Sequence, residues 1–118
     1  MNNEWIYDLE TYPNYFTALF KNVATGEYRQ FTDNNLPSLC EFLNSSHLTL
    51  IGFNNSHYDD VMLMLILANP NVTTADLKTY NDSIIEKTGN DDVKAQMFKV
   101  RRGETPWYSI DIKAITQW

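Results

Sequence analysis

The predicted fold depends on residues 48–68, which read LTLIGFNNSHYDDVMLMLILA. The first six residues, 48–53, form an apolar run with few polar interruptions, which is typical of a strand buried on both faces. A polar loop follows, and then an apolar segment that is long enough for a helix over about 57–68. Ser56 and Asp59 have the spacing of a capping box at the start of that helix. A buried strand followed closely by a helix predicts an α/β domain.

Three further strands are predicted before this segment. Residues 4–9 alternate between apolar and polar, and residues 15–21 read as a second strand after a turn at Pro13-Asn14. A second turn at residues 24–27 contains a glycine that can supply a positive φ, and residues 28–32 follow it as a third strand. Short turns between successive strands predict an antiparallel meander.

The remaining elements are predicted from helical spacing and capping residues. A helix over 36–45 has its apolar residues at helical intervals, and another over about 73–89 begins with Thr73 and Asp76 at capping distance. Residues 90–98 are compatible with a short helix, but their pattern does not decide it. Residues 107–115 begin as a last strand. The order of strands and helices is that of a ribonuclease-H-like α/β layout, an antiparallel meander plus parallel strands with helices on the faces of a mixed sheet.

Length and composition favour one packed domain. The chain has 118 residues, 43 % of them hydrophobic and 14 % aromatic, which suits a globular domain over 1–118 rather than a disordered tail. Residues 70–105 are more polar and are predicted to be a variable helical or hairpin insertion. A formal charge of −6 argues against a simple DNA-binding module, which needs basic residues for phosphate contacts. It is compatible with a nuclease whose carboxylates are neutralised by bound cations.

Neither a disulfide framework nor a membrane segment is predicted. Cys40 is the single cysteine, so the sequence holds no internal disulfide and no CxxC metal site. The N-terminus lacks the basic and apolar regions of a signal peptide, and the longest apolar run, 61–68, is too short to span a bilayer. We therefore expect a cytoplasmic protein, in the host cytoplasm if it is phage-encoded, without a membrane partner.

Two acids lie on alternate positions of the first predicted strand. Asp8 and Glu10 belong to the stretch WIYDLETYP at residues 5–13, and alternate residues of a strand face the same side. Like charges this close repel each other unless a cation holds them together. Mg²⁺ prefers oxygen ligands and commonly takes one or two carboxylates together with water and substrate phosphate. The alternative interpretation is two acids that face solvent on an edge strand.

The loop after the buried strand adds polar residues to this hypothesis. It begins at the carboxyl end of a strand, which is where ligands bind in open α/β sheets. Asp59 would be a third carboxylate, while Asn55 and Tyr58 offer an amide and an aromatic face that suit a single-stranded base. Ser56 and Asp59 could equally serve only to cap the helix, and both interpretations can hold together.

These residues resemble two motifs of a known family. Asp8-x-Glu10 followed by Asn55-x-x-Tyr58-Asp59 is similar to the first two motifs of the proofreading 3′–5′ exonuclease domain of family B DNA polymerases. The phage-type, protein-primed enzymes are most similar, and they belong to the ribonuclease-H-like DEDD nuclease superfamily. The resemblance implies two-metal hydrolysis of the 3′ ends of single-stranded DNA.

Further implications follow from the same resemblance. The stretch WYSIDI at 107–112 resembles a strand that follows the second motif, and the similarity runs from residue 5 to about 113 with a loose fit over 70–105. The residues implied to hold two catalytic Mg²⁺ or Mn²⁺ ions are Asp8, Glu10 and Asp59. Those implied to contact the 3′ end of the DNA are Thr11, Asn55 and Tyr58.

One motif of the family is missing. The enzymes carry a later Tyr-x-x-x-Asp on a helix after the last strand, and no tyrosine of this sequence has an aspartate four positions later. Because the chain stops at Trp118, we expect the final helix, the fourth carboxylate and the polymerase domain to be absent, and the chain alone to be inactive or weak. If another acid completes the site, Asp111 is the first candidate. The alternative is a non-catalytic, truncated exonuclease fold that binds another protein, either the remainder of a polymerase or another copy of the chain.

A basic cluster and a histidine complete the set of candidates. Lys94, Lys99, Arg101 and Arg102 could hold a DNA backbone or could belong to a solvated, charged hairpin. His57 lies inside the second motif and could reach substrate or could simply be exposed where the helix begins.

Overall fold

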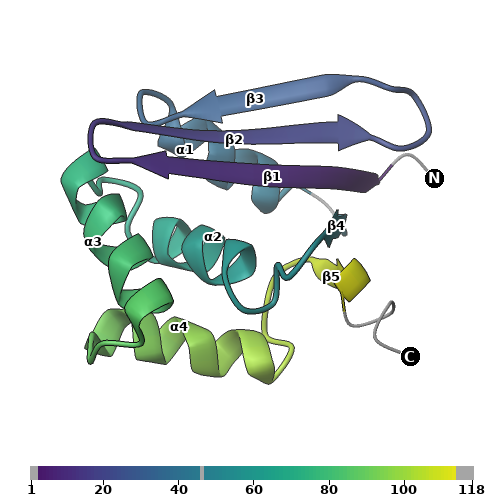
Figure 1. The fold of residues 1–118 in the computed structure, drawn as a ribbon. Helices are drawn as coiled ribbons and strands as arrows, with labels where there is room; N and C mark the ends of the chain where they lie inside the picture. The colour runs from purple at the N-terminus through teal and green to yellow at the C-terminus, as the bar shows by residue number, and fades with distance from the viewer. Residues whose placement is uncertain (1–2, 46, 114–118) are drawn as a thin grey trace.

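The computed structural model describes residues 3–45 and 47–113 (Figure 1). In this part of the chain the elements are β1 (Glu4–Tyr12), β2 (Tyr15–Asn22), β3 (Tyr28–Thr32), α1 (Leu36–Leu43), β4 (Thr49–Gly52), α2 (Asp59–Ala68), α3 (Thr74–Glu86), α4 (Asp91–Arg101) and β5 (Tyr108–Asp111). The predicted order of strands and helices is therefore confirmed.

The strands form one mixed sheet. Their order among the described residues is β3-β2-β1-β4-β5. β2 runs antiparallel to both β1 and β3, whereas β4 and β5 run parallel to β1. Tyr12 pairs with Tyr15 across the two-residue turn that was predicted at Pro13-Asn14, and Gly26 has a φ of 74° in the next turn. The meander and the α/β class agree with the prediction.

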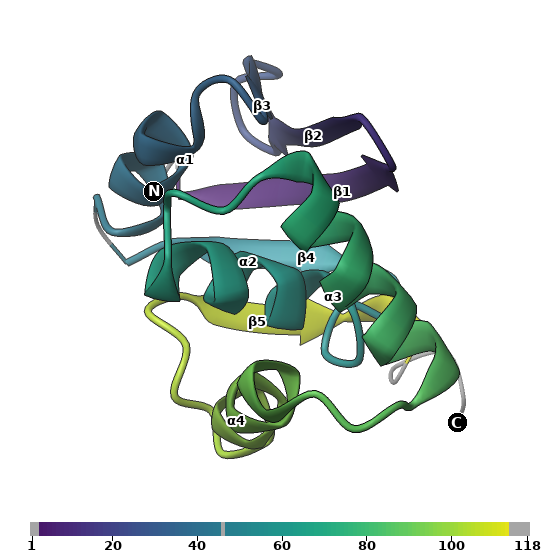
Figure 2. The same ribbon diagram turned by 90° about the vertical axis from the view of Figure 1, so that its left-hand side faces the viewer.

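One face of the sheet carries the core. Along β1 the side chains alternate strictly, so that Trp5, Tyr7 and Leu9 are buried while Ile6 and Asp8 are exposed. The described helices all lie on the buried side (Figure 2). The described helices therefore cover one face of the sheet and leave the other face open.

The strand β4 shows the same asymmetry. Leu50 is fully buried, but Ile51 is only half-buried, because it lies on the open face next to its partner Ile6 on β1. The prediction that this strand is buried on both faces was wrong, because the described helices cover only one face of the sheet.

The helix α2 fills the centre of the helical layer. Residues 61–66 are buried around the whole circumference because α2 lies against the sheet on one side and packs against α4 on another. None of the described helices is long and apolar enough to cross a membrane.

Two helix boundaries differ from the sequence prediction. α2 begins at Asp59 without a side-chain cap, because the Ser56 hydroxyl donates to Asp111 instead of capping the helix. The uncertain stretch 90–98 is part of α4, whose start is capped by the Asn90 side chain accepting from the Val93 amide. The basic residues therefore belong to a helix and its end rather than to a hairpin. The predicted capping box at the start of α3 is present.

Candidate functional site

The candidate site lies at the edge of the sheet where the parallel strands end. The loop of residues 53–58 leaves β4 and turns tightly before α2 begins. A Cβ atom at Gly52 would lie 2.9 Å from Cβ of Asn55 and 3.1 Å from Cε1 of Tyr7, so glycine is required for this close approach. Asn54 has a φ of 60°, a left-handed conformation that asparagine tolerates better than most residues. The local sequence thus allows the loop to fold back over the end of the sheet.

Asp111 holds this loop from the end of β5. Its Oδ1 accepts from the backbone amide of Asn54 at 2.8 Å, and its Oδ2 accepts from the Ser56 hydroxyl at 2.8 Å. The amide of Lys113 donates to Oδ1 at 3.0 Å. Burial acts to raise the pKa of Asp111, but these hydrogen bonds outweigh it and the pKa is lowered. Asp111 is therefore a charged acceptor that positions the loop.

Asp59, one of the three predicted ligands, has a strongly raised pKa. It is partly buried at the start of α2, and its pKa rises from 3.8 to about 7. Burial is the main cause, followed by the negative charges of Asp8, Asp60 and Asp111. The structure therefore brings Asp59 under the electrostatic influence of Asp8, although the two residues belong to different elements.

Asp8 and Glu10 are exposed on the open face of β1, as their spacing predicts. Glu10 accepts a hydrogen bond of 3.0 Å from the Tyr12 hydroxyl on the same face. α2, which carries Asp59, packs against the opposite, buried face of the sheet. Within residues 3–45 and 47–113, no group of three or more His, Cys, Asp or Glu side chains is placed to hold a metal ion.

Two of the predicted DNA contacts are brought together. The Tyr58 hydroxyl lies 3.3 Å from Oγ1 of Thr11 and makes a short hydrogen bond to Oδ1 of Asn81 on α3. Burial raises the pKa of Tyr58, and the charges of nearby aspartates add to this effect. Tyr58 thus connects the loop to β1 and α3.

A buried polar network, which the sequence did not reveal, lies beneath the loop. The Asp60 carboxylate has no exposed surface and accepts from the Tyr7 hydroxyl at 2.5 Å, Ser109 Oγ at 2.5 Å and Trp107 Nε1 at 3.2 Å. Asn55 is also fully buried, and its Nδ2 donates to Ser109 Oγ at 2.9 Å. Asn55, which was predicted to contact DNA, therefore points inward in this structure.

The sequence contains only a weak signal for this network. Asp59 and Asp60 are adjacent at the start of an apolar helix, and spacing alone does not say whether either of them faces inward. Asp60 faces the sheet, where burial raises its pKa against the opposing effect of its three donors. Ser109 and Trp107 come from the stretch around β5 and approach only through the parallel pairing with β4.

Comparison of the chain with protein-family models, with curated proteins and with solved structures gives no significant match. A functional assignment therefore depends on the motifs and on the geometry described above.

Proposed function

We propose that the chain belongs to the proofreading 3′–5′ exonuclease domain of a phage-type DNA polymerase, with Asp8, Glu10 and Asp59 as its metal ligands. The observation that carries the proposal is the pKa of Asp59, raised to about 7 in part by the charge of Asp8. Negative charge gathered at the carboxyl edge of parallel strands is the kind of charge that a bound divalent cation neutralises.

The topology supports the same proposal. An antiparallel meander, β1 to β3, continues into parallel strands β4 and β5, and this agrees with the ribonuclease-H-like layout that the motifs imply. Asp8 and Asp59 lie on the two elements, β1 and α2, on which the first two motifs of the exonuclease family occur.

The chemistry of these residues fits a hard cation. Mg²⁺ and Mn²⁺ take carboxylate oxygens, and Mg²⁺ often has only one or two protein carboxylates with water and substrate oxygens as its other ligands. We infer that Asp8 and Asp59 would hold such an ion, with Glu10 on the same strand face as Asp8. When bound, the ion would activate a water molecule and stabilise negative charge on the scissile phosphate.

The chain's own residues hold this edge in place. Asp111 fixes the loop through Asn54 and Ser56, and the Asp60 network fixes the first turn of α2 against the sheet. Both contacts limit the positions available to Asp59, which lies between them in the sequence. A site that is held by such surrounding hydrogen bonds needs less rearrangement when a ligand binds.

Calorimetric titration of the chain with Mn²⁺ tests the proposal. We expect weak binding by the wild type, at least tenfold weaker binding by Asp8→Asn and by Asp59→Asn, and unchanged binding by Asp92→Asn. Asp92 is an exposed acid in the first turn of α4 and is the matched control. Equal affinity of the Asp8→Asn, Asp59→Asn and control variants would mean that the ion does not bind at this edge.

A second candidate function rests on the open face of the sheet. Ile6 is 50 % exposed there, Leu19 39 % and Tyr108 75 %, and Ile51 and Ile110 lie in register with Ile6. An apolar stripe of this kind is typical of an interaction surface, and a second copy of the chain is the occupant we consider. Sedimentation of the wild type and of Ile6→Glu tests it, because a wild type that stays monomeric at high concentration excludes this function.

A further inference from the structure

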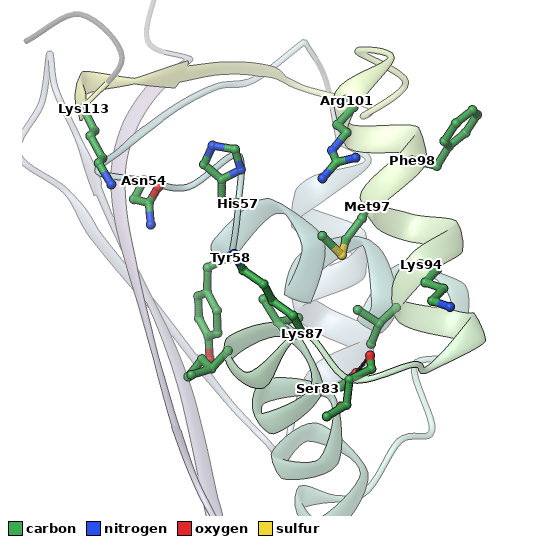
Figure 3. A pocket seen from close by; sticks show the side chains of 14 residues that line it. Asn54, His57, Tyr58, Ser83, Lys87, Lys94, Met97, Phe98, Arg101 and Lys113 are labelled. Atoms are coloured by element: carbon green, nitrogen blue, oxygen red, sulfur yellow. Dashed lines mark hydrogen bonds between the residues drawn. The ribbon is translucent and has the colours of Figure 1, made fainter. Parts of the chain in front are cut away.

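A basic groove lies next to the candidate site. It has a volume of about 1080 Å³ and is bounded by the loop of residues 53–58, α3 and α4 (Figure 3). Its lining has an apolar floor-like part that includes Met97 together with Ile84 and Val93. The groove thus offers a surface that can cover the flat, apolar part of a ligand.

Positive charge surrounds this apolar floor. Of the nine Lys and Arg residues in the sequence, four line the groove, namely Lys87, Lys94, Arg101 and Lys113. No Asp or Glu is among the described residues that line it. This concentration of cations occurs in a chain whose formal charge is −6, so it is opposite in sign to the molecule as a whole.

Most of these cations are not used to hold the fold. The ion pairs among the described residues are Arg29–Glu27, Lys78–Asp82 and Arg102–Glu104. Lys87, Lys94 and Arg101 take part in none of them. Exposed cations that form no ion pair are available to phosphate groups, which they bind with release of counterions.

The side chains that face the groove suit nucleotides. Figure 3 shows His57 on the loop and Arg101 on α4 facing each other across the cavity, with Lys87 extending from the end of α3 toward Tyr58. Imidazole, phenol and guanidinium groups are planar and can stack on bases, while Met97 provides an apolar contact between them. An acidic helix of another protein would match the charges but would make no use of the planar groups.

The groove also continues directly into the candidate site. His57 and Tyr58 line the groove and are followed at once by Asp59. From this continuity we infer that the groove binds the segment of single-stranded DNA that precedes the 3′-terminal nucleotide. The identity of the ligand as DNA rests on the proposed function, whereas the place of binding rests on the groove itself.

Binding of labelled oligothymidylates to the full chain, measured by fluorescence anisotropy in EDTA, tests this inference. The groove variant is Lys87→Gln/Arg101→Gln, and the control is Lys21→Gln/Arg29→Gln, which removes the same charge outside the groove. All four residues are exposed, so both variants should fold, which thermal unfolding verifies. We expect the groove variant to bind at least tenfold more weakly and the control to bind less than threefold more weakly.

Salt dependence gives a second measurement. Loss of two phosphate contacts should reduce the slope of log K against log salt by about 1.4, at about 0.7 for each contact with a single strand. The control should keep the wild-type slope. Affinity should also rise from a dinucleotide to an octanucleotide, because a groove of this size contacts more than one nucleotide.

Three results would overturn the inference: equal weakening in both variants, an affinity that does not increase with length, or competition by oligoglutamate as effective as that by DNA. The outcome is separable from that of the proposed function, because no metal is present in this assay. Failure of the Mn²⁺ titration together with selective loss of DNA binding in the groove variant would reject the nuclease site and support the groove.

Discussion

The hydroxyl of Tyr7 on β1 donates a hydrogen bond of 2.5 Å to the buried carboxylate of Asp60 at the start of α2. Ser109 on β5 and Trp107 just before it donate to the same carboxylate. The first turn of α2 is thereby connected to two strands that lie on either side of β4. The position also places a negative charge at the positive end of the helix dipole.

Replacement of Asp60 should therefore destabilise the fold strongly. In Asp60→Ala the hydroxyls of Tyr7 and Ser109 and the indole of Trp107 lose their acceptor inside the protein, so we expect a loss of about 3 kcal/mol or more in the free energy of unfolding. Urea denaturation followed by tryptophan fluorescence measures it. Tyr7→Phe removes only one donor and should cost about 1 kcal/mol. An Asp60→Ala loss below that of Tyr7→Phe would contradict the role given to the network.

The sequence predicted those parts of the fold that depend on local patterns. Alternation along residues 4–9 and the leucine spacing in 36–45 identify β1 and α1, because each pattern is set within one element. The cap at Ser56 was wrong because its hydroxyl is taken by Asp111, 55 residues away. Asp60 was missed for the same reason, since its three donors meet it only after the sheet has assembled.

Asp59 should make stability fall as pH rises. Its pKa is 3.8 ordinarily and about 7 in the folded chain, so between these values the folded chain binds a proton that the unfolded chain releases. The free energy of unfolding therefore decreases from about pH 4 to pH 7, by up to about 4 kcal/mol if Asp59 alone is considered. Urea denaturation across this range should show a steeper decline for the wild type than for Asp59→Asn.

The variant Asp8→Asn separates the two causes of the raised pKa of Asp59. Asp8→Asn should lower the pKa of Asp59 without returning it to 3.8, because burial is the larger cause and remains. Carbon NMR titration of the Asp59 carboxylate measures this directly.

Added Mg²⁺ should stabilise the wild type more at pH 8 than at pH 5, because Asp59 is ionised at pH 8 and can bind the ion. A pH profile that is the same in wild type and Asp59→Asn would contradict the assignment.

The loop held by Asp111 should open when that acid is neutralised or removed. In Asp111→Ala, the amide of Asn54 and the hydroxyl of Ser56 lose their acceptor, so amide hydrogens over 53–58 should exchange at least tenfold faster. Exchange mass spectrometry measures the change, with residues 61–66 of α2 as the internal reference. Because the pKa of Asp111 is lowered, its stabilising effect is present above pH 4 and is lost as the pH falls. Unchanged exchange in the loop would show that Asp111 does not hold it.

The chain of 118 residues alone should show little or no exonuclease turnover. Two-metal hydrolysis needs both ions held about 4 Å apart around the scissile phosphate. The sequence has no Tyr-x-x-x-Asp motif, and the described residues include no group of three acids placed to hold an ion. A misplacement of about 1 Å in such a site costs on the order of 100-fold in rate.

The experiment that tests this prediction measures release of mononucleotides from labelled single-stranded DNA with Mn²⁺. The variant Asp8→Ala/Glu10→Ala is the control for contaminating nuclease. Robust digestion by the wild type that disappears in the double variant would contradict the prediction. It would mean that the site is completed by another acid, of which Asp111 is the first to test, or by a second copy of the chain.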